Sequence, residues 1–380
     1  MTVDALAVVA LCPPLNREAV GSGGLRTALT NLARASELGA RVSLVVPSDE
    51  PEQLLEARAT VRRMLPEGGT RLTVEGDWTT PRTTDIALAT AATTAKPTRD
   101  HVKADRFVYF VQDWESWFNP VSDGFMEAED SYRQPWEFIT IGKWLRARLE
   151  GLGHRGRVTS IPFGVEVPID VLLSPTRRHR PLVSFNYQPE KLRRLPNLVC
   201  EVSRALHLLR PDVSQAFFGS ESPLPEGVKA ESRGMLTERE MWDMMSSSNA
   251  VVHFSSTNPS RIPFESLACG TPCVELFGDT TLYDFPPGGV VQVMPRVADV
   301  VTVLGEILES PERYRELAIR DALMIPSRDS ERDEFVRALF GGPQEQAPPV
   351  QLRRKPDFVS STSLEGLPFD TSPTAVGVQS

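Results

Sequence analysis

Short apolar runs alternate with amphipathic segments along almost the whole chain, and this alternation restricts the fold more than any other feature. Strand and helix in repeated alternation indicate parallel sheets whose crossover helices cover their faces. The pattern comes in two blocks: the first ends at Ile161–Val165, and a polar, proline-flanked stretch separates it from the second. We therefore predict an α/β protein with two Rossmann-like, doubly wound domains that face each other across a cleft.

The individual elements follow from the apolar periodicity. The expected strands are Leu6–Cys12, Arg41–Pro47, Leu72–Glu75, Asp85–Ala89, Phe107–Gln112, Phe138–Ile141, Leu182–Asn186, Ser214–Phe218, Ala250–Ser255, Pro272–Leu276 and Val290–Met294. The expected helices are Leu25–Leu38, Leu195–Leu209, Glu238–Ser247, Ile262–Cys269, Ala298–Leu308 and Ser330–Phe340. This assigns residues 1–172 to a first domain, 173–181 to a linker and 182–340 to a second domain. Residues 341–380 are rich in Pro, Ser, Gln and Gly without periodicity, so we predict a disordered tail there.

Composition excludes several classes of protein. With 41% hydrophobic and 24% charged residues, the 380-residue chain is globular and long enough for two cores. A net charge of −9 argues against a nucleic-acid-binding protein. No apolar stretch is long enough to span a membrane, and Asp4 precedes the first apolar run where a signal peptide would carry basic residues. We therefore expect a cytoplasmic protein.

Cysteine and histidine spacing gives no sign of a metal site. Cys269 and Cys273 lie close together, but no second pair of ligands is near them, so we interpret them as buried core residues. The five histidines are dispersed, and none has a partner at metal or triad spacing. No acidic metal-binding motif accompanies the segments described below, so we expect neither a metal nor a cofactor.

Two segments have the residues of an anion site. Gly21–Gly24 follows the first strand and opens the first helix, where free amides suit an anion, although a tight turn without a ligand explains the glycines equally well. Thr257–Pro272 follows a strand of the second block, and its turn directs unpaired amides out of the carboxyl edge of the sheet. Glu265 then lies among apolar neighbours, where a buried carboxylate needs a partner. That partner is a ligand or, alternatively, Arg261 one turn back.

Two further segments also end strands. Gln188–Asn197 carries Lys191, Arg193 and Arg194, which either neutralise a diphosphate or form a solvated face. Tyr109–Pro120 places two carboxylates among aromatic rings. This pattern indicates either a sugar-binding wall or an interdomain packing loop in which Asp113 caps a helix.

Together these segments resemble a family. GSGGLRTALTNLARASELGARVSLVV is similar to the opening of GT-B-fold glycosyltransferases. YFVQDWESWFNP and AEDSYRQPWEFITIGKWLRARL resemble bacterial rhamnosyltransferases of rhamnan and surface-layer glycan assembly. SSTNPSRIPFESLACGTPCVEL is similar to the donor-binding segment of that group and of family 4-like retaining enzymes. The likeness covers nearly all of Leu6–Phe340, and two departures stand out. Thr257 occupies the place of the first of two paired glutamates, and Gln188 that of a basic residue.

The resemblance implies a transferase that moves a sugar from a nucleotide diphosphate to a glycan, lipid-linked or protein acceptor. It also implies retention of the anomeric configuration without a general base, and a deoxysugar donor such as dTDP-rhamnose. Glu265 would hold the donor's ribose hydroxyls, amides around Ser260–Ile262 would contact the diphosphate, and the cationic segment would compensate the leaving charge. The predicted donor contacts are Gly23, Gly24, Asn258, Pro259, Ser260, Arg261, Ile262 and Glu265. The predicted acceptor contacts are Gln112, Asp113, Trp114 and Glu115. The predicted catalytic residues are Lys191, Arg193, Arg194 and Asp113.

Two rival functions remain open at this point. A sugar-nucleotide epimerase of the same architecture would form product without an acceptor, and a non-catalytic descendant would bind a sugar nucleotide without turning it over. A basic run is a further feature with two interpretations, peripheral contact with an anionic membrane or a solvated helix face. It consists of Lys143, Arg146, Arg148, His154, Arg155 and Arg157.

Overall fold

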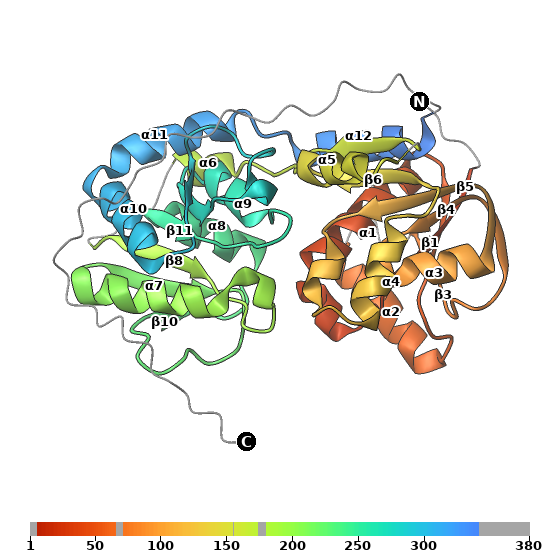
Figure 1. Ribbon diagram of the computed structural model, residues 1–380, viewed down its shortest axis with the longest axis horizontal. Helices are drawn as coiled ribbons and strands as arrows, with labels where there is room; N and C mark the ends of the chain where they lie inside the picture. Colours follow the sequence, from red (N-terminus) through yellow and green to blue (C-terminus); the bar gives the residue numbers. More distant parts are fainter. Residues whose placement is uncertain (1–5, 66–70, 155, 174–179, 342–380) are drawn as a thin grey trace.

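The computed structural model describes residues 6–65, 71–154, 156–173 and 180–341, and it contains two parallel sheets in two units placed side by side (Figure 1). Most of the predicted linker, the residue Arg155 and the predicted tail from residue 342 onward lie outside the described residues. The expected α/β fold with two doubly wound sheets is confirmed.

The first sheet has seven parallel strands in the order β3-β2-β1-β4-β5-β6-β7. The strands are β1 Ala7–Leu11, β2 Arg41–Val45, β3 Thr73–Glu75, β4 Arg82–Ala89, β5 Val102–Val111, β6 Glu137–Ile141 and β7 Val158–Ile161. Their helices are α1 Gly23–Glu37, α2 Pro51–Met64, α3 Ala92–His101, α4 Asp123–Ser131, α5 Lys143–Gly151 and α6 Ile169–Leu173. α1 begins at Ser22, whose hydroxyl accepts the Leu25 amide at 3.3 Å, and it buries the predicted stripe that includes Leu29 and Leu32.

The second sheet has six parallel strands in the order β10-β9-β8-β11-β12-β13. The strands are β8 Leu182–Asn186, β9 Ser214–Phe218, β10 Glu231–Ser232, β11 Ala250–Val252, β12 Cys273–Leu276 and β13 Val290–Val293. The helices that follow are α7 Pro196–Leu209, α8 Glu238–Ser246, α9 Ile262–Ala268, α10 Val297–Glu309, α11 Pro311–Ala322 and α12 Arg328–Phe340. α8 has a full capping box, because Thr237 and Glu240 each accept the other's backbone amide.

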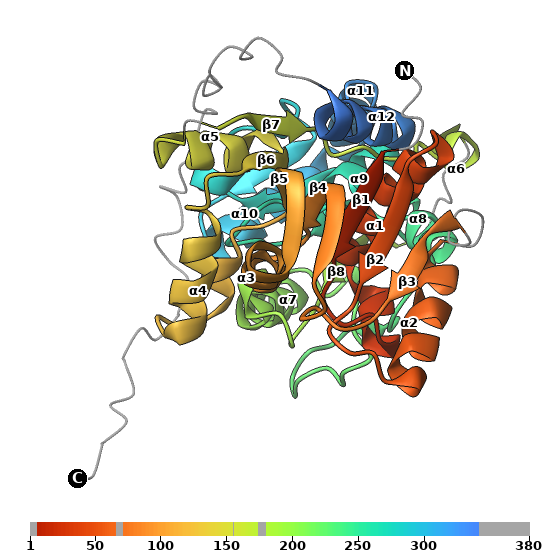
Figure 2. The ribbon, with the colours of Figure 1, turned by 90° about the vertical axis from the view of Figure 1, so that its right-hand side faces the viewer.

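The last helix crosses back to the first unit, although the sequence pattern grouped it with the second (Figures 1 and 2). α12 packs against α1, β6 and β7, and its Phe335 ring meets that of Phe110 in β5 at 5.1 Å. Arg34 of α1 pairs with Asp333 at 2.9 Å. The helix therefore covers the first sheet with an apolar face whose partners lie far earlier in the chain. A hydrogen bond from Arg106 to the carbonyl of Leu339, 233 residues later, adds to this contact.

Strand order determines where ligands can bind. In each sheet the chain winds outward from a central pair, β1 and β4 in the first sheet and β8 and β11 in the second. Open parallel sheets bind ligands outside the carboxyl ends of their strands at this switch point. The glycine loop follows β1, the cationic segment follows β8 and the Thr257 turn follows β11. All three predicted segments therefore lie at switch points.

Candidate functional site

Asp113, directly after β5, joins the two units. Its Oδ1 accepts the backbone amides of Trp114 at 2.8 Å and of Asn258 at 2.9 Å. Its Oδ2 accepts the Thr257 hydroxyl at 3.1 Å and lies 3.6 Å from Arg193 Nε. Burial raises the pKa of this carboxyl, against the opposing effect of Arg193 and Arg194. The predicted acceptor segment thus contacts both the predicted donor turn and the predicted cations.

The turn after β11 extends this contact. The Asn258 side-chain amide donates to the carbonyls of Gln112 at 3.0 Å and Ile141 at 3.2 Å, at the ends of β5 and β6. Thr257, which stands in place of a glutamate of the family pattern, donates to Asp113 instead. The turn also holds the cationic segment, because Ser256 donates through both its amide and its hydroxyl to the carbonyl of Arg193.

The cationic segment forms a short 3-10 turn, Leu192–Arg194, between β8 and α7. Arg193 lies over the Phe118 ring at 4.1 Å, a cation–π contact that orients its guanidinium. Arg194 is 8% exposed, and burial together with Arg193 lowers its pKa to about 10. Burial and the two arginines also lower the pKa of Lys191. Positive charge is therefore concentrated where the backbone of Leu195 has a φ of 47°, which is strained for a residue with a branched side chain.

Glu115 is the second carboxylate of the β5 loop. Its Oε2 accepts the amide of Ala92 at the start of α3 at 2.9 Å, and its own amide donates to the hydroxyl of Tyr132. Burial and the neighbouring Asp113 raise its pKa to about 7, despite the Ala92 amide and Arg193. A buried carboxyl whose pKa lies near neutral pH has the properties of an acid–base group.

The aromatic part of the segment differs from the prediction. Trp114 was predicted to contact an acceptor, but it is fully buried, with its ring between Tyr132 at 4.0 Å and the Arg148 guanidinium at 4.4 Å. A ring enclosed on both faces cannot stack on a sugar. Trp117 and Phe118 are instead 39% and 40% exposed, so they are the rings that can contact a ligand. Trp117 and Phe118 could have been proposed from the sequence, because they belong to the same aromatic segment, Tyr109–Pro120, as Trp114.

α9 contains the predicted donor acid. Glu265 is 7% exposed, and its nearest cation is Arg328 of the α12 start at 3.6 Å. Burial raises its pKa, whereas Arg328 and Arg261 lower it. The alternative ion pair with Arg261 does not form. Arg261 instead donates hydrogen bonds to Glu331 of α12 at 2.6 Å and to Thr27 of α1 at 3.1 Å. This residue, which the sequence predicted to contact the sugar nucleotide, therefore bridges the two units.

The remaining predicted donor contacts surround this helix and α1. Pro259 is buried, and Ser260 and Ile262 are half-buried at the start of α9. Gly23 and Gly24 are exposed in the first turn of α1. A Cβ on Gly24 would lie 3.5 Å from Oε1 of Gln112, which brings the glycine loop next to the β5 loop, whereas a Cβ on Gly23 would meet nothing within 4 Å.

Unpartnered polar atoms gather where these segments meet. Within the described residues, four buried atoms here form no hydrogen bond, and they come from both units: Gln112 Oε1, Arg193 Nε, Arg194 Nη1 and Asn258 Oδ1. Buried polar groups without partners are rare because desolvation costs about 1–3 kcal/mol each. A ligand with both donors and acceptors, and with negative charge, would satisfy all four.

A buried chain of side chains lies beneath the Thr257 turn. Glu275 Oε2 is 2.6 Å from His253 Nδ1, and His253 Nε2 is 2.9 Å from Ser260 Oγ. The expectation that no histidine has a partner at triad spacing is therefore wrong. The pairing of β11 with β12 brings His253 and Glu275 side by side. Two ionisable residues inside apolar strands were the sequence signal for this pair.

Three residues of the basic run are held by contacts with other side chains, whereas Lys143 is exposed and Arg155 lies outside the described residues. Arg146 pairs with Glu150, Arg157 pairs with Glu137, and Arg148 is enclosed by Trp114 and Trp117. The core interpretation of Cys269 and Cys273 is confirmed, since both are fully buried. In the described ranges, His, Cys, Asp and Glu side chains form no group of three or more that could hold a metal ion. No helix described here has the length and apolar character needed to cross a membrane.

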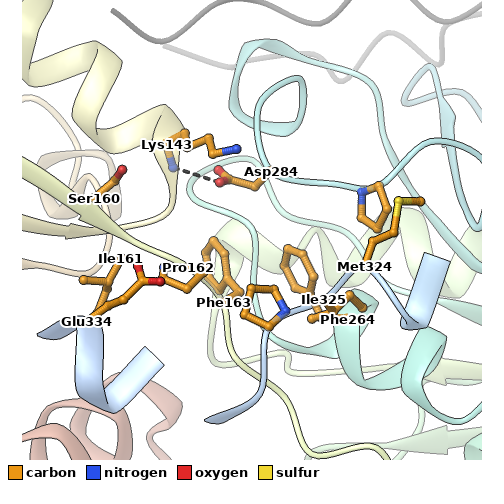
Figure 3. Close-up of a pocket in the computed structure, with 12 residues that line it drawn as sticks. Lys143, Ser160, Ile161, Pro162, Phe163, Phe264, Asp284, Met324, Ile325 and Glu334 are labelled. Atoms are coloured by element: carbon orange, nitrogen blue, oxygen red, sulfur yellow. Dashed lines mark hydrogen bonds between the residues drawn. The ribbon is translucent and has the colours of Figure 1, made fainter. Parts of the chain in front are cut away.

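A cavity of ≈ 250 Å³ lies at the junction of the two units, on the side of α5 and α12 (Figure 3). The stacked rings of Phe163 and Phe264, 4.8 Å apart, form part of its wall. Asp284 of the second unit accepts the Lys143 amide at 2.8 Å and so caps α5 of the first unit. Gly142 permits this cap, because its φ is 86° and a Cβ there would lie 2.6 Å from the Phe163 ring.

Several solved structures that resemble this one are glycosyltransferases. HepE from Anabaena, solved with UDP and glucose, superposes with a TM-score of 0.64 at 11% identity over 88% of this chain and 100% of its own. An α-glucosyltransferase solved with UDP-glucose and DNA gives 0.51 at 12% identity, over 87% of this chain and 98% of its own. TarM of S. aureus, solved with UDP, gives 0.54 at 10% identity over 67% of this chain and 55% of its own. The chain has the GT-B fold. No protein-family model and no curated protein sequence matches it.

Proposed function

We propose that this GT-B protein transfers a sugar from a nucleoside-diphosphate donor to an acceptor hydroxyl. The observation that carries the proposal is the cluster of four buried atoms without a hydrogen bond among the described residues. The donors, Arg193 Nε and Arg194 Nη1, belong to the second unit, and the acceptors are Gln112 Oε1 of the first unit and Asn258 Oδ1 of the second. A sugar diphosphate offers the anionic oxygens and hydroxyls that this cluster lacks. Solved neighbours of the fold that hold UDP support the same choice of ligand.

The roles follow from position. Lys191, Arg193 and Arg194 face the diphosphate and stabilise its charge as the sugar leaves, an electrostatic contribution that preorganised cations make best in a buried site. Glu265 accepts hydrogen bonds from the ribose hydroxyls. Glu115 holds the acceptor hydroxyl, with Trp117 and Phe118 beside it as surfaces for a sugar ring. Asp113 positions the Thr257 turn relative to the cations.

The reaction we propose retains the anomeric configuration, with a leaving-phosphate oxygen taking the proton of the incoming hydroxyl. The sugar bond to the diphosphate breaks, the new glycosidic bond forms on the same face, and the proton leaves with the nucleoside diphosphate. A deoxysugar donor such as dTDP-rhamnose is the specific donor that we propose. A glycan, a lipid-linked saccharide or a protein supplies the acceptor hydroxyl.

Binding and turnover test the proposal together. UDP and dTDP should each raise the unfolding temperature, since a ligand that binds only the native state stabilises it. Product should then form from UDP-glucose, UDP-N-acetylglucosamine or dTDP-rhamnose only when an acceptor is added. Product without an acceptor would identify an epimerase instead. Tight binding of every donor with no turnover would support a binding module.

Glu265→Gln tests the ribose contact. The change keeps the side-chain volume but removes the charged acceptor, and Arg328 keeps its contact with Glu238. We expect the donor KM to rise about tenfold, the loss of one charge-assisted hydrogen bond, with the unfolding temperature nearly unchanged. The exposed Glu316→Gln on α11 is the matched control. An unaltered donor KM would remove Glu265 from the site.

A further inference from the structure

Glu275, His253 and Ser260 are linked in the carboxylate–imidazole–hydroxyl order of a catalytic triad. The contacts of the Ser260 hydroxyl indicate a role other than that of a nucleophile. His253 and Glu275 are completely buried, whereas Ser260 is half-buried in the turn that also belongs to the proposed donor site. Glu275 Oε1 accepts the amides of Ser255 at 2.9 Å and Leu276 at 2.7 Å, so this carboxylate is held rigidly by its strand. Ser260 Oγ in turn accepts the amide of Ile262 at 3.1 Å.

These contacts fix the positions of the protons. Glu275 is an acceptor for His253 Nδ1–H, so neutral His253 has a bare Nε2 that accepts the Ser260 hydroxyl proton. In this state Ser260 has no proton to donate to a phosphate oxygen. If His253 gains a proton at Nε2, that nitrogen becomes the donor, and the Ser260 hydroxyl is released to donate elsewhere.

The charges around His253 come from three directions. Glu275 on β12 favours its protonated form, whereas burial and Arg194 on the 3-10 turn disfavour it and lower its pKa. Cys273 on β12 lies next to it, and burial raises the pKa of that thiol, so the thiol stays neutral. Asp113 acts on the same network through Arg194. An anion bound at Arg194 would cancel the one opposing cation and add a negative charge.

We propose that Ser260, His253 and Glu275 form a proton-linked diphosphate sensor: an anionic diphosphate binding beside Arg194 and Ser260 is accompanied by uptake of one proton at His253 Nε2. The proton comes from hydronium or a buffer acid in the solvent and forms the Nε2–H bond of His253. The Ser260 hydroxyl keeps its own proton and turns from Nε2 to a phosphate oxygen. Arg194 Nη1, buried and without a hydrogen bond among the described residues, supplies the independent sign of an anion at this place. His253 and Glu275 are positioning residues here. The inference rests on the proposed function, because that function supplies the diphosphate.

The sign of the pH dependence follows from linkage. His253 binds its proton more tightly in the complex than in the free protein, so UDP binds more tightly at low pH. The Kd of UDP should rise as the pH rises through the window in which His253 is protonated only in the complex, by at most tenfold per pH unit. Above that window, and below it, the linkage contributes no slope.

The sharpest test reads the imidazole directly. The chain has five histidines, so a protein with ¹⁵N-labelled imidazoles gives few signals, and His253→Asn assigns the one in question. We expect a neutral ring with its proton on Nδ1 in the free protein near pH 7 and a doubly protonated ring when UDP is saturating. Calorimetric titration of UDP in two buffers of different ionisation enthalpy should show proton uptake approaching one per UDP.

Variants separate the possible results. Ser260→Ala should weaken UDP binding about tenfold and shift the pH dependence of Kd, while His207→Asn on α7, the matched histidine control, should change neither. A ring that remains neutral in the UDP complex would overturn the sensor and leave the nucleotide site intact. Failure of UDP to bind the wild-type chain at all would overturn the sensor together with the proposed function. If His253→Asn does not fold, UDP binding by Ser260→Ala and the calorimetric proton uptake of the wild-type protein still test the sensor.

Discussion

At the scale of single residues, Glu115 is held in a state that opposes folding. Its ordinary pKa of 4.5 rises to about 7, mainly because of burial. Between these values the unfolded chain is ionised while the folded chain is protonated, so stability falls as pH rises through the window. At pH 8 nearly the full cost is present, and it is roughly 3–4 kcal/mol at the equivalence of 1.36 kcal/mol per pKa unit. Buried carboxyls with strongly raised pKa values are common at functional sites, where the protonation state takes part in binding or catalysis.

We therefore expect Glu115→Gln to stabilise the chain and to impair the transferase. Urea unfolding should show the variant more stable than wild type at pH 8 by roughly 3–4 kcal/mol and no more stable below pH 4.5. Its turnover should lose the rise that wild type shows through about pH 7, because only the ionised carboxylate accepts the acceptor hydroxyl. Glu127→Gln on the exposed side of α4 is the control. Equal stability gains at both pH values would show that burial does not hold the Glu115 proton.

Arg194 carries the second prediction at this scale. Arg194→Met fills the buried space with an unbranched apolar chain but removes the guanidinium that has an unpartnered Nη1. We expect turnover to fall about 100- to 1000-fold, the usual effect of losing one preorganised donor to developing charge. Thermal stability should rise or stay level, because a cation whose pKa burial lowers to about 10 is removed from the interior. Arg239→Met, which alters an exposed ion pair on α8, should affect neither quantity. A turnover within threefold of wild type would exclude Arg194 from the site.

At the scale of elements, α5 depends on a cap from the other unit. Asp284 accepts the amides of Lys143 at 2.8 Å and Trp144 at 3.4 Å, so a carboxylate of the second unit meets the positive end of a helix in the first. Gly142 precedes the helix with positive φ. A Cβ there would lie 2.6 Å from the Phe163 ring and 2.9 Å from Asp284.

Gly142→Ala should therefore separate the cap from its helix. Steric conflict and backbone strain together should lower the free energy of unfolding by about 3 kcal/mol or more, measured by denaturant titration. Gly151→Ala, at the far end of the same helix, is the matched control. Its Cβ would meet nothing within 4 Å, so it should stabilise by about 0.5–1 kcal/mol. If both substitutions changed the free energy of unfolding by similarly small amounts, the contact between Gly142, Phe163 and Asp284 would adapt to an added Cβ without strain.

At the scale of the molecule, apolar periodicity predicted both sheets and the segments at their switch points. It could not predict which way single side chains turn. Trp114 and Trp117 have similar sequence surroundings, yet one is enclosed by Tyr132 and Arg148 while the other is exposed. The edge strand β7 was missed, because its residues are mostly half-buried and lack a clear apolar face. α12 was placed in the wrong unit, since its partners are fixed by tertiary contacts that local pattern does not contain.

The two units are joined in different ways on their two sides. Toward α12, Val165 forms a β-bridge with Ser327. The buried Glu331 accepts hydrogen bonds from the Arg261 guanidinium and from the Gly164 amide. Backbone pairing and a buried carboxylate therefore hold the units together on this side. At the carboxyl edges, the contact includes Asp113 with Thr257 and Asn258, and the Asn258 side chain with Gln112 and Ile141. This second contact lies where our proposal places the donor and the acceptor, so we infer that it opens and recloses during turnover.

Thr257→Val removes one hydrogen bond from that contact while keeping the side-chain shape. Loss of a hydrogen bond to a carboxylate should shift the balance toward the open form by about 1.5 kcal/mol, so UDP should dissociate about tenfold faster. X-ray scattering of the free protein should give a larger radius of gyration for this variant and more so for Asp113→Ala, with UDP reversing the change. Thr30→Val on α1, whose hydroxyl bonds only within its own helix, is the control. Scattering curves that coincide for all four proteins would mean that Asp113 does not hold the units together, and that closure depends on the α12 side alone.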